Sequence, residues 1–189
     1  RIRRAQAVLE KAERFVDKYD LRMVETLELR RCRADIVAIV GKPFDAIRSY
    51  ENIIEDAERM RANAIYADTW RVLGTLQFKL EENDKAFRSW NIALGLAQET
   101  NDVCLHANLL CDIAEGAIMI HALKTARSVC EQSLSLARQI RHSSLIGRCL
   151  LNQANMLVVQ KDFERADRLI RRVRHIGQKL RMPTLIFSA

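Results

Sequence analysis

Cysteine and histidine are the residue types in this sequence that could bind a metal or supply a catalytic nucleophile and base. The chain has five cysteines and four histidines. It has no C-x-x-C pair, and no histidine is followed three or four residues later by a second metal-binding side chain. The H-E-x-x-H, glycine-rich phosphate-loop and G-x-S-x-G patterns are also missing from the sequence. We therefore expect no enzyme activity, no metal and no cofactor; a dyad of Cys111 with a distant histidine is an unsupported alternative.

The cysteines fit a structural role better. They are Cys32, Cys104, Cys111, Cys130 and Cys149, and most occupy apolar or small positions of helical patterns, where cysteine serves as a small hydrophobic residue. Their odd number and their scatter argue against a disulfide framework and for a reducing compartment. No stretch of about 18 apolar residues and no secretory signal is present. We therefore expect a cytoplasmic protein with no membrane-spanning segment.

The composition favours helices throughout. Among 189 residues there are six glycines and two prolines, so few residues interrupt regular structure. Leucine, alanine, arginine and glutamate, which are good helix formers, dominate the sequence. The chain is long enough to bury a substantial core. We predict an all-α protein with no strands.

A 40-residue periodicity organises the chain. Alanine recurs at positions 46, 86, 126 and 166, each time shortly after a polar turn. The position of Gly74 is occupied by Ala34, Ala114 and Ala154 in the other units, and the position of Ala97 by Ala57, Ala137 and Gly177. Small residues at these positions would let two helix backbones approach closely. Such a steady register over four units predicts an array of helical hairpins, which forms a solenoid because each unit touches its neighbours.

The unit between residues 67 and 97 has the most specific pattern. Trp70, Leu73 and Gly74 share one face of a predicted helix, and the pattern Ala-x3-Trp-x2-Ala follows at residues 86–93. This combination resembles the tetratricopeptide repeat (TPR). The spacing is longer than is usual for that family, so the chain is similar to the longer-repeat variety found in kinesin light chains, cell-polarity adaptors and bacterial regulators. The resemblance implies an α-α superhelical solenoid that binds proteins or peptides.

The repeat register divides the chain into successive units. We expect a single domain over 1–189, consisting of a partial repeat at 1–19, repeats at 23–60, 63–100, 103–141 and 144–181, and the start of a truncated helix at 183–189. The chain begins with arginine rather than methionine, and both ends suggest a fragment of a longer protein.

The resemblance also implies a binding surface. In the TPR family the first helix of every pair lines a groove that holds a peptide or a partner helix. Carried over from the positions around Gly74, this gives a set of partner-binding candidates: Arg31, Asp35, Arg71, Thr75, Asn108, Arg148, Asn152 and Asn155. Asparagine suits an extended peptide because its amide donates and accepts at once, and arginine suits a carboxylate. The alternative is that the arginines pair with acids such as Asp35 and Asp68 within the groove.

Charge is unevenly distributed along the chain. Residues 1–102 have 18 Lys+Arg and 18 Asp+Glu, whereas residues 103–189 have 13 and 6, so the formal charge of +7 lies in the second half. Most of that excess falls on the helix predicted at 163–181, where a solvated face is the simplest interpretation. No aromatic residue lies among residues 165–181 to stack on bases. We therefore expect little nucleic-acid binding.

These observations favour a scaffold or regulatory module that binds a protein or a peptide. Two alternatives stay open. The first is a sensory module fused to a signalling output, such as a nucleotide cyclase or a transcription activator, in which case other domains of the same chain are partners. The second is nucleic-acid binding through the basic C-terminal half.

Overall fold

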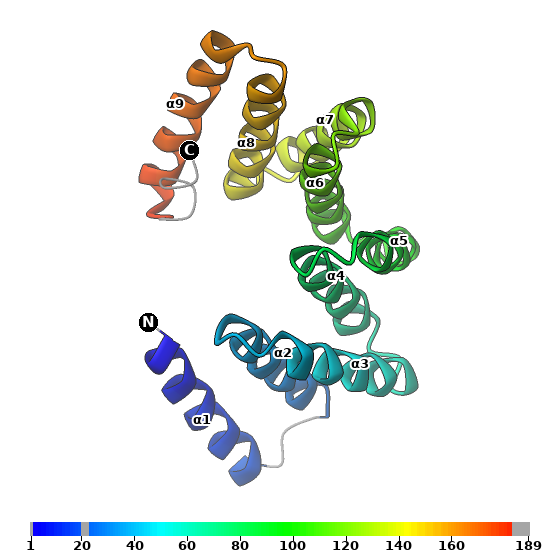
Figure 1. The fold of residues 1–189 in the computed structure, drawn as a ribbon. Coiled ribbons are helices and arrows are strands. Elements are labelled where there is room, and N and C mark those ends of the chain that lie inside the picture. Colours follow the sequence, from blue (N-terminus) through cyan, green and yellow to red (C-terminus); the bar gives the residue numbers. More distant parts are fainter. Residues whose placement is uncertain (1, 20–22, 183–189) are drawn as a thin grey trace. The chain divides into compact units, whose positions relative to one another are not determined.

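The computed structural model describes residues 2–19 and 23–182, and all regular structure in these ranges is helical (Figure 1). The helices are α1 (Ile2–Tyr19), α2 (Met23–Ile39), α3 (Pro43–Arg59), α4 (Asn63–Lys79), α5 (Asn83–Glu99), α6 (Val103–Met119), α7 (Leu123–Gln139), α8 (Ser143–Val159) and α9 (Phe163–Leu180). No strand occurs among the described residues. The all-α prediction is therefore confirmed, and the helices pack in consecutive pairs as a helical repeat fold.

Helix lengths follow the repeat closely. Helices α2 to α8 each have 17 residues, and the ends of the four helix pairs from α2 to α9 lie within two residues of the repeat ranges expected from the sequence. The segment 183–189, expected to start a further helix, lies outside the described residues.

One turn geometry connects the helices from α2 onward. A left-handed residue recurs at every 20th position: Gly41, Arg61, Glu81, Asn101, His121, Arg141, Lys161 and Arg181. At Arg61, for example, the N–H donates to the Glu58 carbonyl at 3.0 Å, and the next N–H, of Ala62, donates to the Ala57 carbonyl at 2.8 Å. This pair of bonds is the Schellman motif, which satisfies the last carbonyls of a helix. The carbonyl of Ala62 then accepts the first bond of the following helix, from Tyr66 at 2.9 Å.

Some turns also supply a side-chain cap to the next helix. Asp102 accepts from the N–H of Leu105 at 2.9 Å, and His142 accepts through Nδ1 from the N–H of Leu145 at 3.2 Å. Such caps satisfy an otherwise unpaired donor of the first helical turn. Asp102 is the N-cap residue of α6, and His142 is that of α8.

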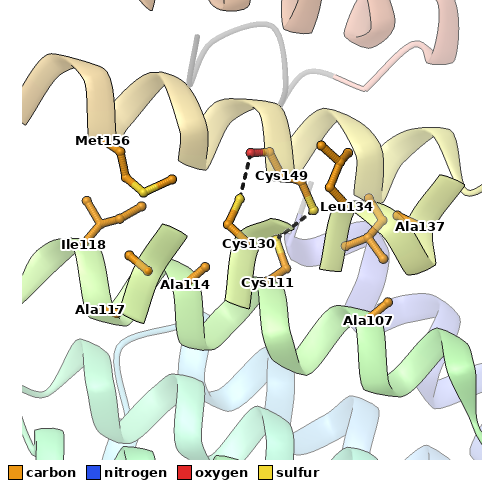
Figure 2. Close-up of a cluster of buried hydrophobic side chains, with 12 residues drawn as sticks. Ala107, Cys111, Ala114, Ala117, Ile118, Cys130, Leu134, Ala137, Cys149 and Met156 are labelled. Atoms are coloured by element: carbon orange, nitrogen blue, oxygen red, sulfur yellow. Dashed lines mark hydrogen bonds between the residues drawn. The ribbon is translucent and has the colours of Figure 1, made fainter. Parts of the chain in front are cut away.

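The packing divides the chain into two compact units, residues 1–96 and 97–189, and the boundary falls inside α5. The expectation of one domain over 1–189 stays a prediction. In the first unit Ala34, Ala46, Tyr50, Ile54 and Leu73 form a buried cluster across α2, α3 and α4. In the second unit α6, α7 and α8 enclose a larger cluster that contains three cysteines (Figure 2).

Small residues form the closest helix contacts, as the 40-residue register predicts. Ala46, Ala86, Ala126 and Ala166 are all buried. A Cβ added to Gly74 would lie 2.7 Å from Trp90 Cδ1 and 3.0 Å from the backbone oxygen of Ala86. Glycine is therefore required where the α5 tryptophan covers α4. Within the described ranges, no helix combines the length and the apolar character that crossing a membrane needs.

Candidate functional site

In the first unit, the sequence-predicted site residues of α2 and α4 form one ion-pair network. Arg31 on α2 contacts Asp35 on the same helix at 3.1 Å and Asp68 on α4 at 3.5 Å. Arg71 also contacts Asp68, through Nε at 2.8 Å. Asp68 thus joins the two arginines and links the first helices of successive hairpins.

Helix α3, the second helix of the α2–α3 hairpin, also contributes to this network. The hydroxyl of Tyr50, on α3, donates to Asp35 at 2.6 Å. Burial raises the pKa of this tyrosine, and the hydrogen bond to Asp35 adds to that effect. Tyr50 therefore stays protonated and serves as a hydrogen-bond donor. Thr75 donates its hydroxyl to the Arg71 carbonyl at 3.0 Å, one turn further along α4.

In the second unit, Arg148 occupies the centre of the corresponding surface. This α8 arginine donates to Asp112 of α6 and to Asn108 Oδ1 at 3.3 Å, and it approaches Glu115 at 3.8 Å. The Asp112 side chain is 6% exposed, the Arg148 side chain 33% and the Glu115 side chain 61%. The arginine therefore spans from a buried carboxylate to a solvated one. It joins first helices of successive hairpins, as Asp68 does in the first unit.

The two asparagines predicted on α8 differ in environment. Asn152 is buried, and its Nδ2 donates to the Cys111 carbonyl at 3.0 Å and contacts Cys111 Sγ at 3.5 Å. It bridges α8 to α6 with the amide that was expected to face a peptide. Asn155, one turn later, is exposed. Asn108 contributes its Nδ2 to the Cys104 carbonyl at 2.9 Å.

The structure therefore brings the predicted residues together in two groups. Arg31, Asp35 and Arg71 meet through Asp68 in the first unit, and Asn108 and Arg148 meet in the second. Sequence reasoning did not include Asp112. The repeat register could have indicated it, because Asp112 occupies in its unit the position that Asn152 occupies in the next.

Other candidate sites are few. Among the described residues, no group of three or more His, Cys, Asp or Glu side chains could hold a metal ion. An open hollow of about 190 Å³ lies between α7, α8 and α9. Its lining includes Arg127, Glu131, Gln153 and Leu169 but none of the predicted site residues. The polar groups on the first helices are therefore separate from this hollow.

Comparison with known proteins supports the fold. No protein-family model and no curated protein matches the chain. Among solved structures, the crystal structure of BtubC (BKLC) from P. vanneervenii is similar, with a TM-score of 0.74 and 18% sequence identity. The match covers 94% of this chain and 72% of that one. At this identity the likeness shows a shared all-α repeat fold.

Proposed function

We propose that the chain is a long-repeat TPR module that binds a protein or a peptide along its first helices. The observation that carries this proposal is the row of partly exposed ion pairs that joins successive first helices, Arg31 and Arg71 through Asp68 in one unit and Arg148 with Asp112 in the other. Within each unit, these ion pairs hold charged side chains in place on neighbouring first helices, and such surfaces are the ones that repeat proteins use for binding.

The chemistry of the row indicates the kind of ligand. An arginine has five N–H donors in a planar fork, so Arg31 and Arg148 can donate to a ligand oxygen and still retain their ion pairs with the neighbouring carboxylates. Glu115 is exposed beside Arg148, and Asn155 is exposed about two turns further along α8, so both can form hydrogen bonds with a peptide backbone. A ligand in extended conformation with carboxylate side chains fits this combination.

The first experiment selects a ligand and maps it to the row. A random-peptide display library would be selected against the 189-residue chain, and the affinity of enriched peptides measured by fluorescence anisotropy. Arg71→Glu with Asn155→Ala should weaken binding about tenfold or more, since a repulsive charge replaces a donor and an amide is lost. Arg171→Glu with Arg174→Glu, on α9, is the matched control because it changes more charge at a site away from the row.

The outcomes separate the proposal from its alternatives. Selective loss in the α4 and α8 variant supports binding along the first helices. Peptides that bind both variants equally, or that lose affinity only in the α9 variant, would contradict it. A sensory module that acts on other domains of its own chain remains the alternative, and the cytoplasmic location is part of the proposal because all five cysteines are free thiols.

A further inference from the structure

The second unit holds three buried cysteines that belong to three consecutive helices. Cys111 on α6, Cys130 on α7 and Cys149 on α8 are each 0% exposed, and their side chains meet inside the same cluster (Figure 2). The Sγ atoms of Cys111 and Cys149 are 4.0 Å apart. The proposed peptide-binding function uses none of these thiols.

The surroundings of the three thiols differ. Ser133 Oγ lies 3.1 Å from Cys149 Sγ. The hydrogen bond with Cys111 and then the one with Cys130 lower the pKa of the Cys149 thiol, and Ser133 and the Arg148 charge act in the same direction against burial. The hydrogen bond to Cys149, together with burial, raises the pKa of both Cys111 and Cys130. Cys149 is thus the most acidic of the three, and the thiolate is the reactive form of cysteine.

We propose that Cys149 and Cys111 are an oxidation site, at which a peroxide joins α8 and α6 through a reversible disulfide. The 4.0 Å between the two sulfurs must shorten to about 2 Å, which requires side-chain rotation and a small approach of the helices. This inference concerns the core of the second unit and does not depend on peptide binding.

The chemistry proceeds in two balanced steps. In the first, the Cys149 thiolate attacks one peroxide oxygen; an S–O bond forms, the O–O bond breaks, and hydroxide leaves. In the second, Cys111 sulfur attacks the resulting sulfenic acid; the S–S bond forms, the S–O bond breaks, and the thiol proton leaves with the hydroxyl as water. The hydroxide of the first step takes up the proton that the Cys149 thiol released on ionisation, so two thiols are oxidised by two electrons in total and one hydrogen peroxide is reduced to two waters.

Cys111 is a better partner for Cys149 than Cys130 is. The Cys130 thiol donates to the backbone carbonyl of Cys149, with Sγ 3.4 Å from that oxygen, and a disulfide with Cys149 would give up this hydrogen bond. Cys111 Sγ instead contacts Cys149 Sγ and the Asn152 amide. A disulfide would therefore replace the contacts of Asn152 with Cys111 Sγ and of Ser133 with Cys149 Sγ. The two joined cysteines are also the chain neighbours of the Arg148–Asp112 pair.

The test uses the full chain with Cys32→Ser and Cys104→Ser, because these two cysteines are exposed and would form links between molecules. The protein is treated with hydrogen peroxide, its remaining thiols are alkylated, and the digest is examined by non-reducing mass spectrometry. We expect the disulfide between residues 111 and 149 to be about ten times as abundant as either the 111–130 or the 130–149 disulfide. We also expect that dithiothreitol removes it and that Cys130→Ser retains it.

Treatment of the same protein in urea is the control. In the unfolded chain, the 111–130 and 130–149 pairs close shorter loops than the 111–149 pair, so loop-closure entropy favours the other two links. In the folded protein, the 111–149 link should instead be the most abundant of the three. A native link ratio equal to the unfolded one would overturn the assignment. The assignment would also be overturned if Cys111, Cys130 and Cys149 all stayed reduced at a peroxide concentration that oxidises Cys32 and Cys104 in the unsubstituted chain.

Discussion

The α4–α5 hairpin and the α6–α7 hairpin have the same register and different packing. In the first, Trp90 lies over Gly74, and its Nε1 donates to the Arg71 carbonyl at 3.2 Å. In the second, the equivalent positions hold Cys130 and Ala114, both fully buried, and Cys130 donates to the Cys149 carbonyl of α8 instead. A large side chain faces glycine in one hairpin, and a small one faces alanine in the other.

The two hairpins therefore use different residue types at the same positions of the repeat. Trp90 also packs against Phe78 and Phe87, with ring centroids 5.5 and 5.4 Å away. The sulfur-containing core of α6 to α8 replaces this aromatic group with Cys111, Cys130, Cys149 and aliphatic side chains. Close packing of either kind can fill the space between helices, so each hairpin can vary its core if both partners change together.

Removal of the aromatic side chain should give the largest effect. Trp90→Ala should lower the free energy of unfolding by about 3–5 kcal/mol, because it leaves a cavity where the indole ring packed against α4. Cys130→Ala should cost about 1 kcal/mol, since it removes a single buried heavy atom. Urea unfolding followed by circular dichroism measures both. Equal losses would show that the two hairpins do not differ in the way their volumes suggest.

The second largest effect concerns the ion pairs of the two units, which should contribute differently to the free energy of unfolding. Arg148→Met should cost about 3 kcal/mol because it removes the arginine that pairs with the buried Asp112 carboxylate. Arg71→Met should cost at most about 1 kcal/mol, since Asp68 keeps Arg31 and is partly exposed. Asp112→Asn in the Arg148→Met background should recover part of the loss. If that double variant is no more stable than Arg148→Met alone, the carboxylate is not the source of the cost.

The size exchange between the hairpins can be tested directly. Gly74→Ala should cost about 2 kcal/mol, because the added Cβ meets the Trp90 ring. In a Trp90→Cys background, which reproduces the α6–α7 combination, the same change should be neutral or stabilising by up to about 1 kcal/mol through helix propensity. The double-mutant cycle isolates this coupling. Additive effects would mean that Trp90 does not determine the residue at position 74.

The smallest expected effect concerns surface charge. The formal excess of +7 lies after residue 102, and Arg165 and Arg171 of α9 are 70% and 79% exposed. We predict weak, sequence-independent binding to duplex DNA at low salt, with a dissociation constant of about 10⁻⁴ M or higher that is lost near physiological salt. Arg171→Glu with Arg174→Glu should abolish it. Tight, sequence-selective binding at physiological salt would instead favour the nucleic-acid alternative.

The sequence was sufficient for the positions that repeat by type. Ala46, Ala86, Ala126 and Ala166 were recognised by their 40-residue spacing, and all four are buried contacts. The shorter, 20-residue turn register was missed because its left-handed positions hold glycine, arginine, glutamate, asparagine, histidine and lysine. No residue type marks these turns, since the Schellman hydrogen bonds are made by the backbone.

The candidate site was predicted less completely. Pairing of the arginines with acids such as Asp68 was named as an alternative, and the structure has these contacts, but the register could not show that Asp68 lies between Arg31 and Arg71 or that Asn152 turns inward to Cys111. The three buried thiols were also invisible as a group, because their proximity arises from packing between three helices. Side-chain partners across helices depend on the rotation of each helix, which periodicity determines only to within a face.

The turn described for Arg61 has a consequence for how this chain tolerates length changes. The same short connection joins the two helices within a hairpin and the last helix of one hairpin to the first of the next. The backbone therefore repeats with every helix, whereas the side-chain pattern repeats with every second helix. Inserting or deleting one helix with its turn would leave every other turn intact and yet exchange the first-helix and second-helix positions of all helices that follow. Only the gain or loss of a whole hairpin would keep the alternation of first and second helices in the rest of the chain.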